Sequence, residues 1–157
     1  MQVLPPDRVT KLLDAYLLAH YRWENDGEWR WLRIGETAPE LEAAFPQAGR
    51  FALLSAWDPQ SEVRDKTVNR REDAELHRQL AEGAYNIRAA FSSAPDRSWR
   101  EPSWLVLDMD NDTLDALARR FGQLGTLSWE RGRVARLRMD TTAPPGYGAF
   151  PCVDWLK

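Results

Sequence analysis

Polar side chains interrupt the apolar segments of this sequence at a few places where they could do chemistry. Asp58 follows an apolar run at 51–57, and Glu101 and Ser103 lead into a second apolar run that continues from Trp104. Ligand sites combine apolar walls with a few convergent polar groups, and a carboxyl beside tryptophans can have a raised pKa and act as a general acid or base. We therefore expect a pocket for a small polar ligand, a nucleotide or another metabolite, with Glu101 as the catalytic acid or base. The expected ligand-binding residues are Ser55, Trp57, Asp58, Asn69, Arg71, Trp99, Ser103 and Gln123.

Each of these polar residues also has a purely structural interpretation. Asn69 can cap a helix, and Asp58 can form an Asx turn before the proline that follows it. Glu101 can pair with a neighbouring arginine, and Gln123 can satisfy a backbone group. For a single residue the structural role is the more common one, so the prediction of a site depends on the set lying together.

The familiar catalytic signatures are absent from the sequence. It contains no GxGxxG, Walker phosphate loop, GxSxG, HExxH or CxxC motif. The two histidines, His20 and His77, are far apart, and the single cysteine, Cys152, has no histidine near it. We therefore expect no metal, no cofactor and no thiol nucleophile.

Composition restricts the class of protein. The chain has 157 residues, of which 43% are hydrophobic and 29% charged, and its formal net charge is −3. No apolar run approaches the ~20 residues that a membrane span needs, and one cysteine cannot form an intramolecular disulfide. We expect a cytoplasmic, globular protein. Nucleic acid is disfavoured as a partner because the basic residues at 64–71 alternate with acidic ones.

The elements that must position the candidate site follow from apolar periodicity and turn residues. A first helix is expected over 7–20, a hairpin over 21–34 around Asn25-Asp26-Gly27, and a short helix after Thr37. The later expected elements are a strand at 51–57, a helix at 69–82, strands at 85–91 and 103–109, a helix starting at 110–113, and a hairpin of strands 124–129 and 134–139.

The order of elements from 51 to 129 predicts the fold class. Strand, helix, strand, strand, helix, strand is the order of a ferredoxin-like split β-α-β core, an α+β fold extended here by the N-terminal helix and hairpin. We expect one domain over 1–140 and a Pro/Gly-rich tail over 141–157. In that topology the end of the strand at Trp57 and the start of the strand at Ser103 meet at one sheet edge, near a helix N-terminus suited to an anion.

Several short motifs and single residues stand in order along the middle of the chain. They are Ser55-Ala56-Trp57-Asp58-Pro59, Asn69, Leu76 and Leu80 before Gly83, Trp99-Arg100-Glu101-Pro102-Ser103, and Arg120-Phe121-Gly122-Gln123. With these motifs the sequence resembles the bacterial domain-of-unknown-function family DUF3293, over roughly residues 16–139. The resemblance implies a compact bacterial cytosolic domain with no established activity. Asp58 departs from the family pattern, which favours Asn there.

Two tryptophans on the predicted hairpin support an alternative function. Trp29 and Trp31 share one face of their strand, where they could form an exposed platform for a partner protein or for unstacked bases. More often, such residues cover the open side of a sheet, here under the N-terminal helix. The alternative to a ligand site is therefore a non-catalytic protein-interaction module that uses this face or an open sheet edge. A single-stranded nucleic-acid binder is the third and weakest interpretation.

Overall fold

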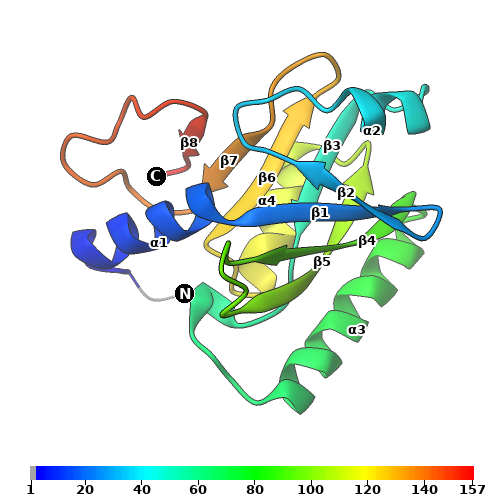
Figure 1. The fold of residues 1–157 in the computed structure, drawn as a ribbon. Coiled ribbons are helices and arrows are strands. Elements are labelled where there is room, and N and C mark those ends of the chain that lie inside the picture. Colours follow the sequence, from blue (N-terminus) through cyan, green and yellow to red (C-terminus); the bar gives the residue numbers. More distant parts are fainter. Residues whose placement is uncertain (1–2) are drawn as a thin grey trace.

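The protein is a mixed α/β structure built on one large sheet (Figure 1). The structure is a computed structural model and describes residues 3–157. None of the helices in this range has the length and apolar character needed to cross a bilayer. The elements are α1 (Pro6–Leu18), β1 (His20–Asn25), β2 (Glu28–Leu32), α2 (Pro39–Ala44), β3 (Arg50–Leu54), the 3-10 helix η1 (Pro59–Ser61), α3 (Lys66–Glu82), β4 (Ile87–Ser93), β5 (Arg100–Leu107), α4 (Asn111–Arg120), β6 (Gly125–Glu130), β7 (Arg136–Met139) and β8 (Val153–Trp155).

The sheet has eight strands in the order β2-β1-β4-β5-β3-β6-β7-β8. Neighbouring strands are antiparallel except for β7 and β8, which are parallel. The predicted mixture of helices and an open, mainly antiparallel sheet is confirmed. The more specific ferredoxin-like prediction is not, because this sheet is larger than the sheet of that fold.

Both faces of the central strands are buried. In β3, Phe51 and Leu53 belong to a core cluster that includes residues of α1 and α2. The alternate residues, Ala52 and Leu54, belong to a second cluster that includes residues of α3 and α4. Because successive side chains of a strand point to opposite faces, a strand covered on both sides must be apolar at every position. This explains the continuous apolar run that begins at Phe51.

Helix α3 begins earlier than the sequence pattern indicates. Asp65 caps it by accepting a hydrogen bond of 2.7 Å from the backbone N–H of Thr67. Asn69, expected at the helix start, therefore lies inside the helix and is only 1% exposed. The expectation of an anion site at a helix N-terminus marked by Asn69 loses its structural basis.

The segment expected as a C-terminal tail contributes a strand to the sheet. β8 pairs with β7, in the register Leu137 with Val153. Val153 is buried in the first core cluster, and the indole N–H of Trp155 donates to the carbonyl of Tyr147 at 2.9 Å. Residues 141–157 thus pack against the body of the protein.

Candidate functional site

Side chains from three distant motifs are joined at one end of β3. The Ser55 hydroxyl donates to the carbonyl of Pro102 at 2.9 Å and accepts from the backbone N–H of Trp57, also at 2.9 Å. The side-chain amide of Gln123 donates to the carbonyl of Trp57 at 2.9 Å. These bonds connect the end of β3, the start of β5 and the link between α4 and β6.

The loop after β3 has a strained backbone. Asp58, Gln60 and Ser61 have φ angles of 40°, 51° and 60°, in the left-handed region that non-glycine residues rarely adopt. The link between α4 and β6 holds this loop, since the Gln60 N–H donates to the carbonyl of Gly122 at 2.8 Å. Gly122 itself has φ +68°, and a Cβ there would lie 2.7 Å from the Cβ of Pro59. Such strain persists only where the surroundings impose it, and it concentrates at functional sites.

Asn69 anchors the same loop from α3. Its amide nitrogen donates to the Asp58 carboxylate at 2.7 Å, and its amide oxygen accepts from the Asp58 N–H at 3.0 Å. The same oxygen accepts from Nε of Arg64 at 2.6 Å, and Arg64 also donates to the carbonyl of Ala56 at 2.9 Å. The polar groups of Asn69 are thus engaged within the protein, which supports a positioning role for it.

A small cavity, which we call the Glu101 chamber, lies beside this loop. Its volume is about 50 Å³, room for only a few non-hydrogen atoms. It is bounded by α1, η1 and the sheet, and no Lys or Arg within residues 3–157 lines it. Its polar lining consists of Tyr16, Tyr21, Ser55, Ser61, Ser92, Glu101, Ser103, Gln123 and Thr126.

The carboxyl group of the chamber favours its neutral form. Burial and, as the smaller cause, the negative charge of Asp58 together raise the pKa of Glu101 to about 8. Burial likewise raises the pKa of Tyr16 to about 12, and its hydroxyl lies 3.1 Å from that of Ser61. At neutral pH the chamber therefore contains a protonated carboxyl and neutral hydroxyls, which can donate as well as accept hydrogen bonds.

One hydroxyl of the chamber is unsatisfied. Ser103 is 5% exposed, and its side-chain oxygen has no hydrogen-bond partner among the described residues. A buried polar group without a partner is unfavourable by about 1–3 kcal/mol and is rare in folded proteins. A ligand atom or a water molecule in the chamber would remove that penalty.

The structure brings together only part of the expected site. Ser55, Glu101, Ser103 and Gln123 line the chamber. Asp58 and Asn69 lie beside it, in the loop network, and Trp57 takes part through its backbone.

Two expected residues lie apart, and several lining residues were not anticipated. Arg71 on α3 and Trp99 before β5 are exposed and do not line the chamber. Tyr16 and Ser61 were missed. Tyr16 fits the apolar stripe of its helix, and only its phenolic oxygen distinguishes it as a chamber residue. Ser61 carries no sequence signal, because its position depends on the strained loop.

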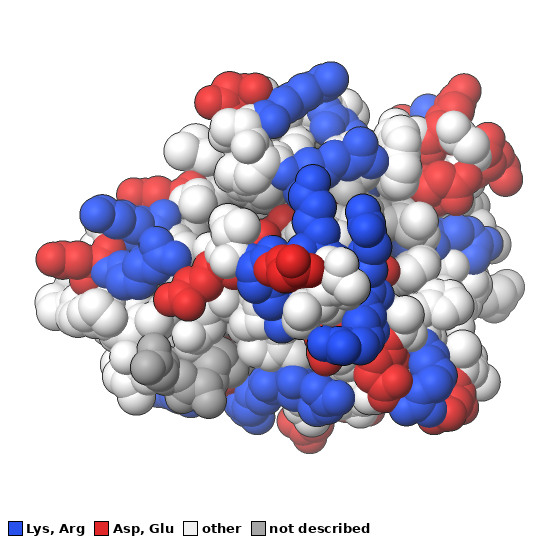
Figure 2. Space-filling view, turned by 90° about the horizontal axis from the view of Figure 1, so that it is seen from below, with Lys and Arg blue, Asp and Glu red and all other residues white. Residues whose placement is uncertain are grey.

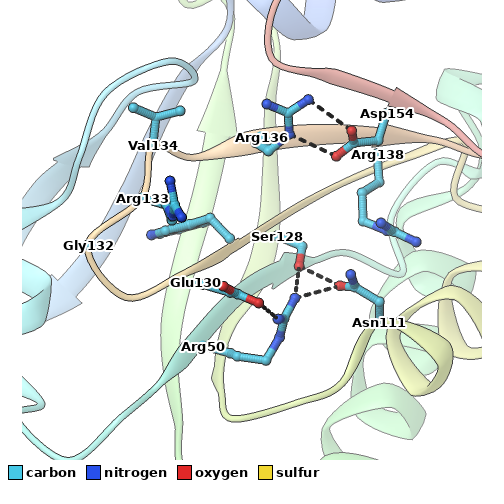
Figure 3. A pocket seen from close by; sticks show the side chains of 11 residues that line it. Arg50, Asn111, Ser128, Glu130, Gly132, Arg133, Val134, Arg136, Arg138 and Asp154 are labelled. Carbon is cyan, nitrogen blue, oxygen red and sulfur yellow. Dashed lines mark hydrogen bonds and ion pairs between the residues drawn. The ribbon is translucent and has the colours of Figure 1, made fainter.

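A larger hollow of about 530 Å³ lies over β6 and β7 (Figure 3). Arginines dominate its lining, but most of them are already paired. Arg50 donates to Glu130 at 3.0 Å, and Arg136 forms two bonds with Asp154 at 2.9 and 3.0 Å. Arg138 forms a similar two-bond pair with an aspartate of α4. The hollow therefore has little uncompensated charge to attract an anion.

The wider surface also mixes both signs of charge. On the face seen in Figure 2, Lys and Arg side chains gather near the middle, with Asp and Glu between and beside them. Among the described residues, no group of three or more His, Cys, Asp or Glu side chains is arranged to hold a metal ion.

Comparison with known proteins supports the resemblance found in the sequence. The family described as "Protein of unknown function (DUF3293)" matches residues 54–125, a little under half of the chain. The resemblance is confirmed over that segment, which contains every expected site residue but not Tyr16. No curated protein matches the chain. No solved structure matches it either.

Proposed function

We propose that the Glu101 chamber binds the polar end of a small ligand that carries no negative charge. The observation that carries this proposal is the buried, unpartnered hydroxyl of Ser103, which lines the same cavity as the Glu101 carboxyl. An anion would meet the charge of nearby Asp58 and no cation among the described lining residues. A neutral or basic group would find several hydroxyls and a carboxyl.

The cavity volume limits the size of the ligand. At about 50 Å³ the chamber is well below the roughly 300–1,000 Å³ of typical small-molecule sites. A whole nucleotide does not fit, so of the two ligand types expected from the sequence, a small metabolite is the better supported. Its amine, amide or hydroxyl end enters the chamber, and the rest of it stays outside.

Glu101 supplies the chemistry of the proposed site. In its neutral form the carboxyl donates its proton toward a basic atom of the ligand, and the resulting carboxylate lies beside the cation that it has created. The Tyr16 hydroxyl, whose pKa burial raises to about 12, keeps its proton and orients the ligand by hydrogen bonding.

A thermal-shift screen with small amines, amides and alcohols tests this proposal. At about 100 times its dissociation constant a ligand adds about 2.7 kcal/mol, which raises the melting temperature by several degrees. The shift is expected in the wild type and in Glu62→Gln, an exposed control nearby, and is expected to vanish in Glu101→Gln. A screen without hits, or a hit that Glu101→Gln leaves unchanged, would contradict the proposal.

The proposal also includes the ferredoxin-like topology and the cytoplasmic location that the sequence predicts. A split β-α-β unit needs a strand between the two that a helix connects. Two features of the sheet support this topology. Helix α3 connects β3 to β4, and β5 lies between those two strands. Helix α4 connects β5 to β6, and β3 lies between those two strands. A cytoplasmic location is supported by the single cysteine.

The alternative function is a protein-interaction module on the hairpin face. It is favoured by the exposure of Trp29 and Trp31, each 43% accessible. Light scattering tests self-association, and a pull-down that is lost on Trp31→Ala tests a different protein partner. The charges around these rings favour another kind of partner.

A further inference from the structure

A second surface, which shares no described lining residue with the Glu101 chamber, combines aromatic rings with arginines. Cross-strand pairing puts Arg22 beside both Trp31 and Phe91, and Arg100 beside Ser93, so that these side chains share one sheet face. We call this surface the Arg-Trp face and define it by Arg22, Trp29, Trp31, Phe91, Arg97 and Arg100.

Two arginines of this face lie over its rings. The guanidinium carbon of Arg22 lies 4.0 Å from the ring centroid of Trp31, and that of Arg100 lies 3.8 Å from that of Phe91. An arginine over an aromatic ring can stack on a base and donate its N–H groups to a phosphate.

The positive charge of the face is not compensated. Arg22, Arg97 and Arg100 have no carboxylate partner among residues 3–157, unlike the paired arginines of Figure 3. Burial lowers the pKa of Arg22, and the charges of Arg97, Arg100 and Arg33 lower it further. Cations held together without counter-charges attract an anion.

A hollow in this face contains a buried donor without a partner. The hollow has a volume of about 350 Å³ and is lined by the three arginines, Trp29, Phe91 and Ser93. Ser93 is 3% exposed, and its hydroxyl makes no hydrogen bond within the described chain. An oxyanion in the hollow would accept from that hydroxyl and from the guanidinium groups.

We propose that the Arg-Trp face binds single-stranded nucleic acid, with one phosphate in the Ser93 hollow and bases stacked on Trp29 and the neighbouring guanidinium planes. The face extends beyond the Ser93 hollow, because Trp31 belongs to it without lining that hollow, and Trp29 also lines a second hollow of about 270 Å³ beside α2. Single strands expose bases that stack on aromatic and arginine planes, whereas a duplex hides them. The basic residues at 64–71, whose mixed charges disfavoured nucleic acid, do not line either hollow.

Fluorescence anisotropy with a labelled 12-nucleotide oligouridylate tests the proposal. With about three phosphate contacts, the logarithm of affinity is expected to fall with that of salt at a slope near −2. Arg97→Gln and Arg100→Gln each weaken binding and flatten the slope, whereas Arg71→Gln, an exposed control on α3, leaves both unchanged. Trp29→Ala weakens binding roughly fivefold or more.

The Ser93→Ala variant distinguishes a loss of nucleic-acid binding from a loss of folding stability. Removing an unpartnered buried hydroxyl should leave the melting temperature unchanged or raise it, while weakening oligouridylate binding. No binding at low salt, equal losses in Arg71→Gln, or equal affinity for a duplex would overturn the proposal. Competition by uridine monophosphate as effective as that by the strand would also overturn it, since a single nucleotide would then suffice. Glu101→Gln should not affect this binding, so the two proposals fail independently.

Discussion

The side-chain amide of Gln123 donates a 2.9 Å hydrogen bond to the backbone carbonyl of Trp57, across 66 residues of sequence. A second, longer donation of 3.3 Å reaches the carbonyl of Phe121. One buried side chain thus connects the two ends of the segment that matches the family. It also fixes the chain just before the strained loop that forms a wall of the Glu101 chamber.

Replacing Gln123 tests whether this bond stabilises the fold. Gln123→Ala removes the donor to the carbonyls of Trp57 and Phe121, and we expect a loss of about 1–3 kcal/mol in the free energy of unfolding, measured with urea. Gln123→Glu should lose more at neutral pH, because a carboxylate cannot donate, and should recover on acidification as it gains a proton. A Gln123→Glu protein as stable as the wild type at pH 7 would show that the bond contributes nothing.

Substitutions at two glycines distinguish the stability lost through backbone strain from the stability lost through close packing. Gly122 and Gly132 both have positive φ angles, but a Cβ at Gly132 meets nothing within 4 Å, whereas one at Gly122 meets Pro59. Gly132→Ala should lose about 1–2 kcal/mol of stability through the backbone alone. Gly122→Ala should lose a further 1–3 kcal/mol or so through overpacking. Equal losses in denaturant titrations would mean that Pro59 moves aside freely.

The stability of the protein should depend on the titration of Glu101. Its pKa is about 8 in the folded protein and 4.5 ordinarily, so between these values the folded state binds a proton that the unfolded state releases. Stability therefore falls as pH rises from about 5 to 8, by at most about 1.4 kcal/mol per pH unit. Glu101→Gln should remove this component, measured as the difference between the urea-unfolding pH profiles of the two proteins. Parallel profiles would contradict the expectation.

Asp58→Asn should lower the pKa of Glu101. The charge of Asp58 is the second cause of the raised value, after burial. Asn also tolerates the left-handed backbone, and its carbonyl can still accept the bonds from Asn69 and Arg64. Carbon NMR of the Glu101 carboxyl should show a lower midpoint in this variant and no change in Asp14→Asn, an exposed control on α1. An unchanged midpoint in Asp58→Asn would leave burial as the sole cause.

Local sequence rules predicted the elements of the fold better than the details of the site. The continuous apolar run at 51–57 indicated a strand buried on both faces, and the core clusters on either side of β3 agree with it. The hairpin turn at Asp26-Gly27 is also confirmed, with β1 and β2 pairing directly on either side of it. The strand β8 has only three residues, too few for any periodic pattern.

The placement of the candidate residues was predictable where topology alone determines it. Placing the end of one strand and the start of another at one edge correctly brought Ser55 and Glu101 together. Asn69 was misplaced because Asp65, four residues earlier, is the residue that caps the helix. Tyr16 comes from α1, and no local rule predicts which strands a helix will cover.

Titration of the Glu101 carboxyl carbon by NMR in the wild-type protein is the first experiment to make. It measures whether Glu101 keeps its proton at neutral pH, in a chamber where a ligand can receive it. We expect a midpoint near 8, which shifts on addition of a compound found in the thermal-shift screen. A midpoint near the ordinary 4.5 would mean that Glu101 is ionised at neutral pH and that the chamber has no carboxyl proton to donate to a ligand.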